Sequence, residues 1–362
     1  MEREKNRNKS EKGLQPQGWS PLGPHLFLEL SKKFPILDVR SPKEYLQGHI
    51  PGASSLPLFT DEERAVVGTT YTRAGKEAAI RRGLTIVGPE LELFVQKALE
   101  IAPGKEVLIH CWRGGMRSEA MAWLLQFAGI KTTILPGGYK AYRHFIRQSF
   151  LQGPEVRILG GMTGSGKTEL LHELSSLGEQ VIDLEKLACH KGSAFGALGQ
   201  PDQPTHEQFE NNFAEKWLAL DPGRPVWIED ESRNVGKVII PDALFAKMSS
   251  APMVFIEVPF SERVERLAAE YGCFETSALV QIFEKISRRI GGDIALSAIK
   301  SLNNGNVQAA IAAALKFYDK TYEYGISKRN QETIRKVSIS EFIQEIKNPS
   351  SSSIVGTFPC HR

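Results

Sequence analysis

The chain has 362 residues, and its 45 Lys and Arg against 42 Asp and Glu leave a formal net charge of +3. That length predicts two domains, since one domain takes roughly 150 residues, and no run reaches the roughly 20 apolar residues of a membrane span. The four cysteines are far apart and the N-terminus is charged, which argues against a disulfide framework, a cysteine-rich zinc site and a secretory signal, and favours a cytoplasmic protein.

The first half of the chain alternates strands and helices. We expect a disordered tail over residues 1–20 and a first domain over residues 21–152. Apolar runs between turn residues predict strands at 35–40, 107–109 and 132–135, and amphipathic stretches predict helices at 25–33, 90–102, 119–127 and 140–150. This alternation indicates a parallel sheet covered on both faces, so the fold class is α/β.

Residues 60–88 form a charged, glycine-containing insertion. It is long for a plain connection, which is typical of a functional or a disordered segment. Its arginines, together with lysines further along the chain, are candidates for contacts with RNA phosphates, although ordinary solvated charge is the alternative for each of them. The candidates are Arg73, Arg81, Lys186 and Lys191.

The stretch 107–118, VLIHCWRGGMRS, reads as a strand, a tight loop and a helix start. Cys111 ends the strand, and a glycine-rich loop before a helix can turn its backbone N–H groups inward to bind an anion and favour a thiolate. Arg113 and Arg117 add positive charge at the rim. The anion-binding loop comprises Trp112, Arg113, Gly114, Gly115, Met116, Arg117 and Ser118. A cysteine that simply packs at the end of a strand is the alternative.

A second α/β domain is expected over residues 153–345, followed by a tail over 346–362. After a strand at 156–159, the segment from Gly161 to Thr168 matches G-x-x-x-x-G-K-T and precedes a helix at 169–177. Such a loop wraps phosphates with backbone N–H groups, while Lys167 supplies charge and Thr168 can hold Mg²⁺. The phosphate-binding residues are Gly161, Met162, Thr163, Gly164, Ser165, Gly166, Lys167 and Thr168.

The rest of this domain predicts strands at 180–183, 225–230 and 253–258 and helices over 279–324. Glu229 and Asp230 end one strand and are candidates for the acidic side of a magnesium site, with a capping role as the alternative. Arg263 and Arg266 are either within reach of phosphate or solvated. The aromatic residues at 317–324 are expected to pack in the core.

Several stretches resemble known families. LDVRSPKEYLQGHIPGA, HCWRGGMRS and LPGGYKAYR look like a rhodanese domain, whose loop cysteine carries a persulfide. With the P-loop, the stretches ERAVVGTTYTRAG, DLEKLACHKGSAFG, WIEDESRNVG and FYDKTYEYG resemble the tRNA 2-selenouridine synthase family from about residue 34 to 324. This resemblance implies a rhodanese-like parallel-sheet domain followed by a P-loop α/β domain with a helical C-terminal part.

The resemblance also implies a function. The family is a transferase that replaces the sulfur of a wobble 5-substituted 2-thiouridine in tRNA with selenium from selenophosphate, through an S-geranylated intermediate made from geranyl diphosphate. Cys111 stands at the family's essential cysteine. The implied co-substrates are selenophosphate and geranyl diphosphate, with Mg²⁺ as an option, no tightly bound cofactor and no resident metal. The implied partners are the tRNA anticodon loop and a selenophosphate supply, with no membrane and a monomeric chain.

Two other functions stay open. His110, Cys111 and Arg117 also fit the H-C-x₅-R pattern of cysteine phosphatases, in which the arginine clamps the phosphate. Alternatively, the P-loop half resembles small-molecule kinases, and the chain would then be a kinase with a sulfur-carrier domain.

Overall fold

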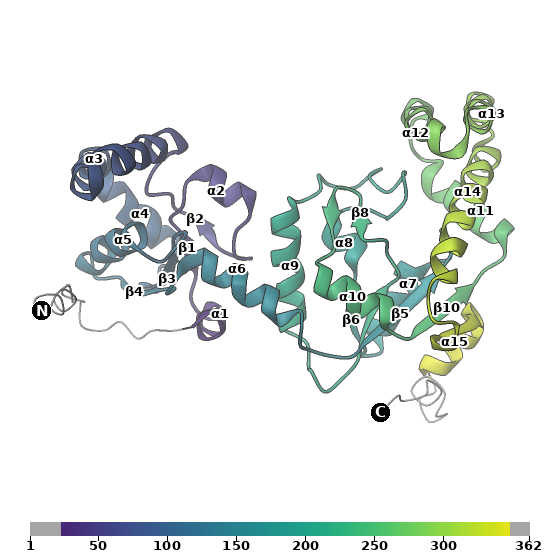
Figure 1. The fold of residues 1–362 in the computed structure, drawn as a ribbon, viewed down its shortest axis with the longest axis horizontal. Coiled ribbons are helices and arrows are strands. Elements are labelled where there is room, and N and C mark those ends of the chain that lie inside the picture. Colours follow the sequence, from purple (N-terminus) through teal and green to yellow (C-terminus); the bar gives the residue numbers. More distant parts are fainter. Residues whose placement is uncertain (1–22, 348–362) are drawn as a thin grey trace, which may run out of the picture. The chain divides into compact units, whose positions relative to one another are not determined.

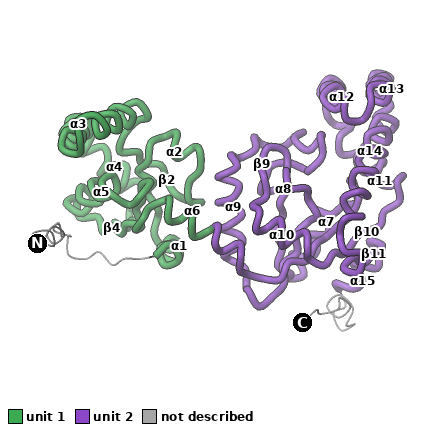
Figure 2. Tube along the Cα trace, in the orientation of Figure 1, with its two compact units in different colours: residues 1–146 green, residues 147–362 purple. Residues whose placement is uncertain are grey.

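The computed structural model describes residues 23–347, and the chain divides into two compact units, Met1–Ile146 and Arg147–Arg362 (Figures 1 and 2). The division falls inside helix α6 (Gly138–Ser149). The tail predicted over 1–20, and the part of the tail predicted over 346–362 that follows Lys347, lie outside the described residues. Within the described range, no helix is both long and apolar enough to cross a membrane.

The first unit is built around a four-stranded parallel sheet with strand order β2-β1-β3-β4. The strands are β1 (Ile36–Asp38), β2 (Ser54–Ser55), β3 (Glu106–His110) and β4 (Lys131–Ile134). The helices are α1 (Pro24–Ser31), α2 (Pro42–Gln47), α3 (Asp61–Val87), α4 (Leu91–Ile101), α5 (Met116–Phe127) and α6, with a 3-10 turn η1 (Gly88–Glu90) before α4. Apolar residues of β1 and β3 share one core with side chains of α4 and α5. The predicted strands and helices of this half are confirmed, with ends shifted by a few residues.

The segment 60–88, expected to be a functional insertion or disordered, is the long helix α3. The helix begins with reciprocal hydrogen bonds, because Thr60 Oγ1 accepts the N–H of Glu63 at 3.2 Å and Glu63 Oε2 accepts the N–H of Thr60 at 2.8 Å. Gly75, with a φ of +88°, interrupts the helical backbone. Most side chains of α3 are exposed, so its charged composition belongs to a solvated helix.

The second unit contains a five-stranded parallel sheet with strand order β11-β10-β5-β7-β6. The strands are β5 (Val156–Gly161), β6 (Gln180–Ile182), β7 (Val226–Glu229), β10 (Met253–Glu257) and β11 (Ile334–Ser338). The helices around the sheet are α7 (Lys167–Ser176), α8 (Leu184–Ala188), α9 (His206–Leu218), α10 (Asp242–Ser250), α11 (Phe260–Tyr271) and α15 (Ile339–Lys347). A short antiparallel ribbon joins β8 (Asn234–Val235) to β9 (Val238–Ile239). Strand β5 lies at the centre of the sheet and is buried throughout.

The predicted helical part consists of α12 (Thr276–Ile290), α13 (Gly292–Asn303) and α14 (Val307–Ser327), which share an apolar core with α11. After α14, a 3-10 turn η2 (Gln331–Thr333) leads into β11, which returns to the sheet and pairs in parallel with β10. The sequence patterns did not predict this edge strand, nor α9, α10 and the β8–β9 ribbon. The α/β fold class with two parallel sheets and a helical C-terminal part is confirmed.

Candidate active sites

The G-x-x-x-x-G-K-T motif forms the turn between β5 and α7, the context that a phosphate-binding loop requires. Strand β5 ends at Gly161, and α7 begins at Lys167. Lys167 Nζ donates to the carbonyl of Gly161 at 3.2 Å, so its ammonium group lies across the loop. The first N–H groups of a helix have no partner within the helix, and together with this ammonium they form a site for an anion.

Acidic side chains gather beside this loop. Thr168 Oγ1 donates to Glu185 Oε2 at 3.3 Å, and the Glu185 N–H donates to Glu229 Oε1 at 2.8 Å. Burial and the charge of Asp183 raise the pKa of Glu229 to about 8, so this carboxyl group is protonated at neutral pH. Burial also raises the pKa of Glu185, and burial together with Glu185 raises that of Glu231. The surroundings therefore shift the pKa values of all three carboxyl groups towards the neutral form, and a cation bound beside them would oppose this shift.

Helix α14 reaches the beginning of the P-loop through Tyr322. Its hydroxyl accepts the N–H of Gly161 at 3.1 Å and donates to Asp230 Oδ2 at 2.7 Å. Arg329 donates to the other carboxylate oxygen of Asp230 at 3.1 Å. Burial, followed by the charge of Asp230, raises the pKa of Tyr322, which keeps its hydroxyl protonated. Asp230, a predicted magnesium-side acid, is thus hydrogen-bonded by two residues from the C-terminal part.

A second contact joins α14 to the loop through Arg263. The sequence left this arginine between a phosphate contact and a solvated charge, but it is buried. Its guanidinium donates to both carboxylate oxygens of Asp319, at 2.8 and 2.7 Å, and to the carbonyl of Thr163 at 3.1 Å. Arg266 lies at the other end of the loop, since a Cβ added to Gly166 would lie 1.7 Å from its guanidinium nitrogen.

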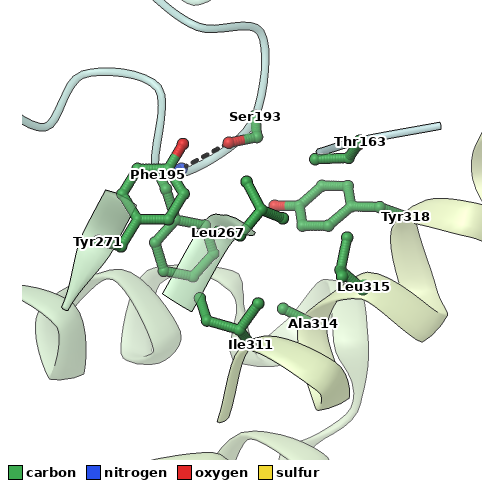
Figure 3. Close-up of a pocket in the computed structure, with 9 residues that line it drawn as sticks. All are labelled: Thr163, Ser193, Phe195, Leu267, Tyr271, Ile311, Ala314, Leu315 and Tyr318. Carbon is green, nitrogen blue, oxygen red and sulfur yellow. Dashed lines mark hydrogen bonds between the residues drawn. The ribbon is translucent and has the colours of Figure 1, made fainter. Parts of the chain in front are cut away.

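A small pocket lies between this loop, α11 and α14 (Figure 3). Its walls are largely apolar and include Phe195, Leu267 and Ile311, whereas Thr163 and Ser193 lie together at one end. The pocket is therefore polar where it meets the P-loop and apolar further away.

In the first unit, Cys111 directly follows the buried strand β3 and is 4% exposed. Its Sγ lies 3.3 Å from Ser118 Oγ, and the Ser118 hydroxyl is also 2.9 Å from the carbonyl of Gly115. This hydroxyl can turn to donate to a thiolate. Helix α5 begins at Met116, so its N-terminal N–H groups follow the loop and favour an anion there.

The backbone of this loop packs against the turn that begins α6. Gly114 has a φ of +66° and Gly138 a φ of +59°, and a Cβ on Gly138 would lie 2.4 Å from the Cys111 carbonyl. The same carbonyl accepts the Tyr139 N–H at 2.9 Å. Both positions need glycine because of conformation and space. Trp112, Arg113 and Met116 lie at the loop surface, with Trp112 and Met116 exposed and Arg113 also open to solvent.

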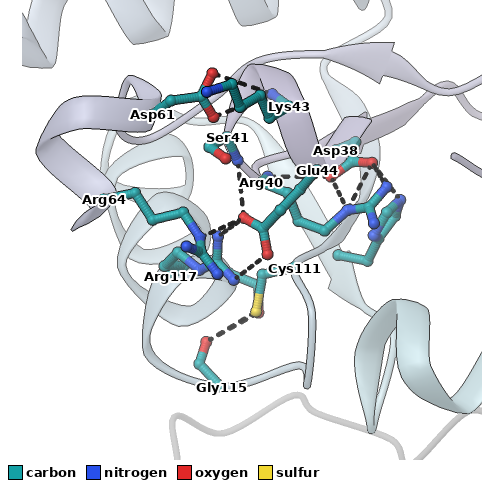
Figure 4. A network of polar contacts seen from close by, with 12 residues as sticks. Asp38, Arg40, Ser41, Lys43, Glu44, Asp61, Arg64, Cys111, Gly115 and Arg117 are labelled. Atoms are coloured by element: carbon teal, nitrogen blue, oxygen red, sulfur yellow. Dashed lines mark hydrogen bonds and ion pairs between the residues drawn. The ribbon is translucent and has the colours of Figure 1, made fainter. Parts of the chain in front are cut away.

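Arg117, predicted to add charge at the rim, is ion-paired with Glu44 at 2.6 Å (Figure 4). Glu44 also accepts Arg64 Nε at 2.8 Å and the Ser41 N–H at 3.1 Å. Burial alone would raise the pKa of Glu44, but these donors, chiefly Arg117, lower it to about 2. The positive charge of Arg117 is therefore compensated by a carboxylate of the protein itself.

A buried ion pair lies behind the cysteine loop. Arg40 donates to both oxygens of Asp38, and its guanidinium lies 3.8 Å from the centre of the Tyr139 ring. His110 Nε2 is 3.6 Å from Asp38 Oδ2, yet burial lowers the pKa of His110 to about 4. His110 is thus neutral at physiological pH, and it supports the loop without adding charge to it.

The candidates for RNA contacts lie on exposed surfaces of their own units. Arg73 and Arg81 are on α3, where Arg81 also binds Glu77 at 2.7 Å. Lys186 is exposed on α8, and Lys191 forms an ion pair with Glu270. Their role in binding RNA stays a prediction. The three described cysteines are free thiols, and Cys360 lies outside the described residues.

These features define a class of protein in which a sheet domain with a cysteine loop is joined to a P-loop α/β domain. Comparisons with known proteins agree: a rhodanese-like domain model matches residues 24–144, and a model of the tRNA 2-selenouridine synthase AAA domain matches residues 154–286. The tRNA 2-selenouridine synthase of Psychromonas ingrahamii is 33% identical over 348 residues, which cover 87% of this chain and 93% of that protein. The chain belongs to the tRNA 2-selenouridine synthase family.

Other relatives match over a shorter range. The synthases of Nitrosomonas europaea and Bdellovibrio bacteriovorus are each 40% identical, over 245 and 256 residues respectively. These matches cover 66% of this chain but 63% and 65% of the relatives, so the chain spans just under two thirds of their length.

Proposed function

We propose that this chain is a transferase that replaces the sulfur of a wobble 2-thiouridine in tRNA with selenium. One observation supports the proposal most strongly. This member of the family contains both a cysteine loop and a P-loop, and the P-loop lies between a strand and a helix as such a loop requires. Each loop ends at a helix N-terminus and suits an anion. The two anionic co-substrates implied by the resemblance, geranyl diphosphate and selenophosphate, would each take one of them.

In the first half-reaction, the thiocarbonyl sulfur of the base would attack the first carbon of geranyl diphosphate and diphosphate would leave. The P-loop suits that leaving group, because backbone N–H groups and Lys167 stabilise the charge that develops on it. In the second, selenium from selenophosphate would replace the geranylated sulfur, which leaves as geranylthiol while water takes the phosphoryl group as phosphate. Neither step changes an oxidation state, so no further oxidant or reductant is needed.

Cys111 is the candidate nucleophile of the second half-reaction. Its thiolate would take the phosphoryl group from selenophosphate and release selenide, which would displace geranylthiol from carbon 2 of the base, and water would then cleave the phosphorylated cysteine to free thiolate and phosphate. Cys111 is the one described cysteine in an anion-binding loop, whereas Cys189 and Cys273 lie outside both loops. A thiolate is the reactive form of cysteine, and the Ser118 hydroxyl at 3.3 Å is placed to stabilise it.

Mg²⁺ would supply positive charge to the diphosphate. Thr168 and Glu185 are the residues that would hold it, since Mg²⁺ is typically bound by one or two protein oxygens together with phosphate and water. Glu229 and Asp230 fit less well, because Glu229 Oε1 already accepts the Glu185 N–H and Asp230 is bound by Tyr322 and Arg329. Among residues 23–347, no three acidic, histidine or cysteine side chains are grouped to hold a metal by themselves.

The rival functions find less support in the side chains. A cysteine phosphatase would use Arg117 to clamp phosphate, but that guanidinium is bound to Glu44. A kinase would use an acid at the end of β7 or just after it for its magnesium ion, but Glu229 accepts the Glu185 N–H and Asp230 is bound by Tyr322 and Arg329.

The proposal is tested by nucleoside mass spectrometry of tRNA from cells that lack this protein. Selenouridine should be absent, should return when the chain is supplied, and should stay absent when Cys111→Ser is supplied. Cys273→Ser is the matched control, because this exposed cysteine lies outside both loops, and it should restore selenouridine fully. Normal selenouridine in the deleted strain, or full rescue by Cys111→Ser, would refute the proposal.

A further inference from the structure

An exposed tryptophan lies directly beside the buried cysteine of the first unit. Trp112 follows Cys111 in the loop and is 36% exposed, whereas Cys111 is 4% exposed. The carbonyl of Trp112 accepts the N–H of Lys140 at 3.0 Å, and the carbonyl of Cys111 accepts the N–H of Tyr139 at 2.9 Å. Two hydrogen bonds to the start of α6 therefore fix the backbone that carries the indole.

The indole of Trp112 also contacts the core of the unit. Its ring centre lies 5.9 Å from that of Tyr139, and the two rings are inclined at 45°. Tyr139 is fully buried, and the guanidinium of Arg40 lies 3.8 Å from its ring centre. The indole is thus supported by buried side chains while part of its surface meets solvent. An aromatic ring held in this way offers a surface on which a planar ligand can stack.

Two exposed cations flank this tryptophan. Arg113 follows it in the loop, and Lys140 is joined to it through the backbone hydrogen bond. Among residues 23–347, neither cation forms an ion pair, whereas Arg117 of the same loop is bound to Glu44. Aromatic rings combined with available cations are typical of sites for single-stranded nucleic acid, because the rings stack on bases and the cations contact phosphates.

We infer that Trp112 stacks on the wobble base of the tRNA and holds it beside Cys111. Arg113 and Lys140 then bind the neighbouring phosphates. The inference rests on the proposed function and assigns a base-binding residue to it. The proposed second half-reaction releases selenide at Cys111 and uses it at carbon 2 of the base, so the base must lie at this loop. The bases of a single-stranded RNA loop can turn outward to stack on a side chain.

A second exposed tryptophan of this unit gives a matched control. Trp123 lies on α5 and stacks on Phe127, with ring centres 6.0 Å apart. It follows Met116, where α5 begins, by about two turns, or about 10 Å along the helix. Trp123 is 63% exposed, so it is the same residue type with more exposed surface but without a place beside the cysteine.

The first test measures how the full chain binds two RNAs. One is an anticodon stem-loop with 2-thiouridine at the wobble position, and the other is the same RNA with an abasic wobble nucleotide. Trp112→Ala should weaken binding of the first RNA by at least about fivefold, the smallest effect expected of one stacked base, and should leave binding of the second unchanged. Trp112→Phe should restore most of the affinity, and Trp123→Ala should change neither affinity.

The abasic RNA distinguishes stacking from a support of the loop. An equal loss of affinity for both RNAs in Trp112→Ala would overturn the inference, because a disturbed loop would weaken both. No loss in Trp112→Ala, or the same loss in Trp123→Ala, would overturn it as well. In these cases the proposed function stands, since the unmodified chain still binds the thiolated RNA. If the unmodified chain does not bind that RNA, the inference and the proposed function are both wrong.

The second test separates the base from the phosphates. Arg113→Ala/Lys140→Ala should weaken binding of both RNAs and reduce the slope of log affinity against log salt by about 1.4, or about 0.7 for each charge. Trp112→Ala should leave this slope unchanged, because stacking on an uncharged ring releases no counterions. An unchanged slope in the double variant, or a reduced slope in Trp112→Ala, would contradict the inference.

Discussion

Glu44 collects three donors around one carboxylate beside the cysteine loop: Arg117, Arg64 and the Ser41 N–H. Arg117 belongs to α5, Ser41 immediately precedes α2 and Arg64 is in α3, so this side chain ties three elements of the first unit together. A half-buried carboxylate needs such partners to compensate for lost hydration. Single residues of this kind determine how the loops are held.

Replacing Glu44 with glutamine should remove a pH dependence of stability. The pKa of Glu44 is about 2 in the fold against its ordinary value of 4.5, so its contribution is present above pH 4.5 and lost as the pH falls from 4.5 towards 2. Glu44→Gln should cost up to about 3 kcal/mol at pH 7, about half of that at pH 3, and little at pH 2. Urea unfolding of the first unit across this range measures it. Glu77→Gln, at an exposed site, should show no such change, and a constant cost for Glu44→Gln would disprove the explanation.

The titration of Glu229 should change the pH dependence of stability in the opposite direction. Its pKa is raised to about 8, so the folded protein holds a proton that the unfolded chain releases above pH 4.5, and stability falls as the pH rises from 4.5 to 8. Glu229→Gln imitates the protonated form and should stabilise the second unit by up to about 4 kcal/mol at pH 7.5, with little effect at pH 4.5. Thermal unfolding at both pH values tests this, and destabilisation at pH 7.5 would show that the carboxylate form is needed.

At the scale of elements, α14 contacts the P-loop at two points, once directly and once through Arg263. Tyr322 and Asp319 lie three residues apart, a spacing that places both on one face of a helix. Tyr322 accepts the N–H of Gly161, the first glycine of the loop. Asp319 binds Arg263, which in turn donates to the carbonyl of Thr163 in the middle of the loop. The helical C-terminal part therefore supports the candidate phosphate-binding loop through these contacts.

Tyr322→Phe should weaken phosphate binding more than it disturbs the fold. The change leaves the Gly161 N–H without its acceptor and Asp230 Oδ2 without the Tyr322 hydroxyl, while Arg329 still donates to Oδ1. Such a loss costs about 1–3 kcal/mol. Pyrophosphate affinity should fall roughly five- to tenfold if about 1 kcal/mol of that loss reaches the binding site. Tyr324→Phe is the control, since Tyr324 is 65% exposed on the same helix. Equal pyrophosphate affinities in the two variants would mean that Tyr322 does not shape the loop.

The elements that carry the chemistry could be predicted because their signals are local. The apolar run into Cys111 and the G-x-x-x-x-G-K-T motif each specify a strand, a loop and a helix within about a dozen residues. The contacts of Tyr322, Arg329 and Glu44 could not be predicted, because they join residues far apart in the chain. Strand β11 has five residues, two of them charged, and it is a strand only because β10 offers an open edge.

At the scale of the whole molecule, RNA binding should follow the charge of exposed helices. If α3 contacts phosphates of a single-stranded loop, Arg73→Ala/Arg81→Ala should weaken tRNA binding and reduce the slope of log affinity against log salt by about 1.4, or about 0.7 per charge. Removing the acid that pairs with Arg81, in Glu77→Gln, should have the opposite effect on affinity. Fluorescence titration with tRNA at several salt concentrations measures both the affinity and the slope. An unchanged slope in the double variant would place the tRNA elsewhere.

The division of the proposed reaction between two loops is tested most directly by assaying the two half-reactions separately in vitro. Lys167→Ala should fail to geranylate thiolated tRNA, because the diphosphate loses its cation, yet it should selenate tRNA that is supplied already geranylated. Cys111→Ser should do the reverse and accumulate geranylated tRNA. Equal loss of both half-reactions in each variant would contradict two separate sites and the division of the chemistry between them.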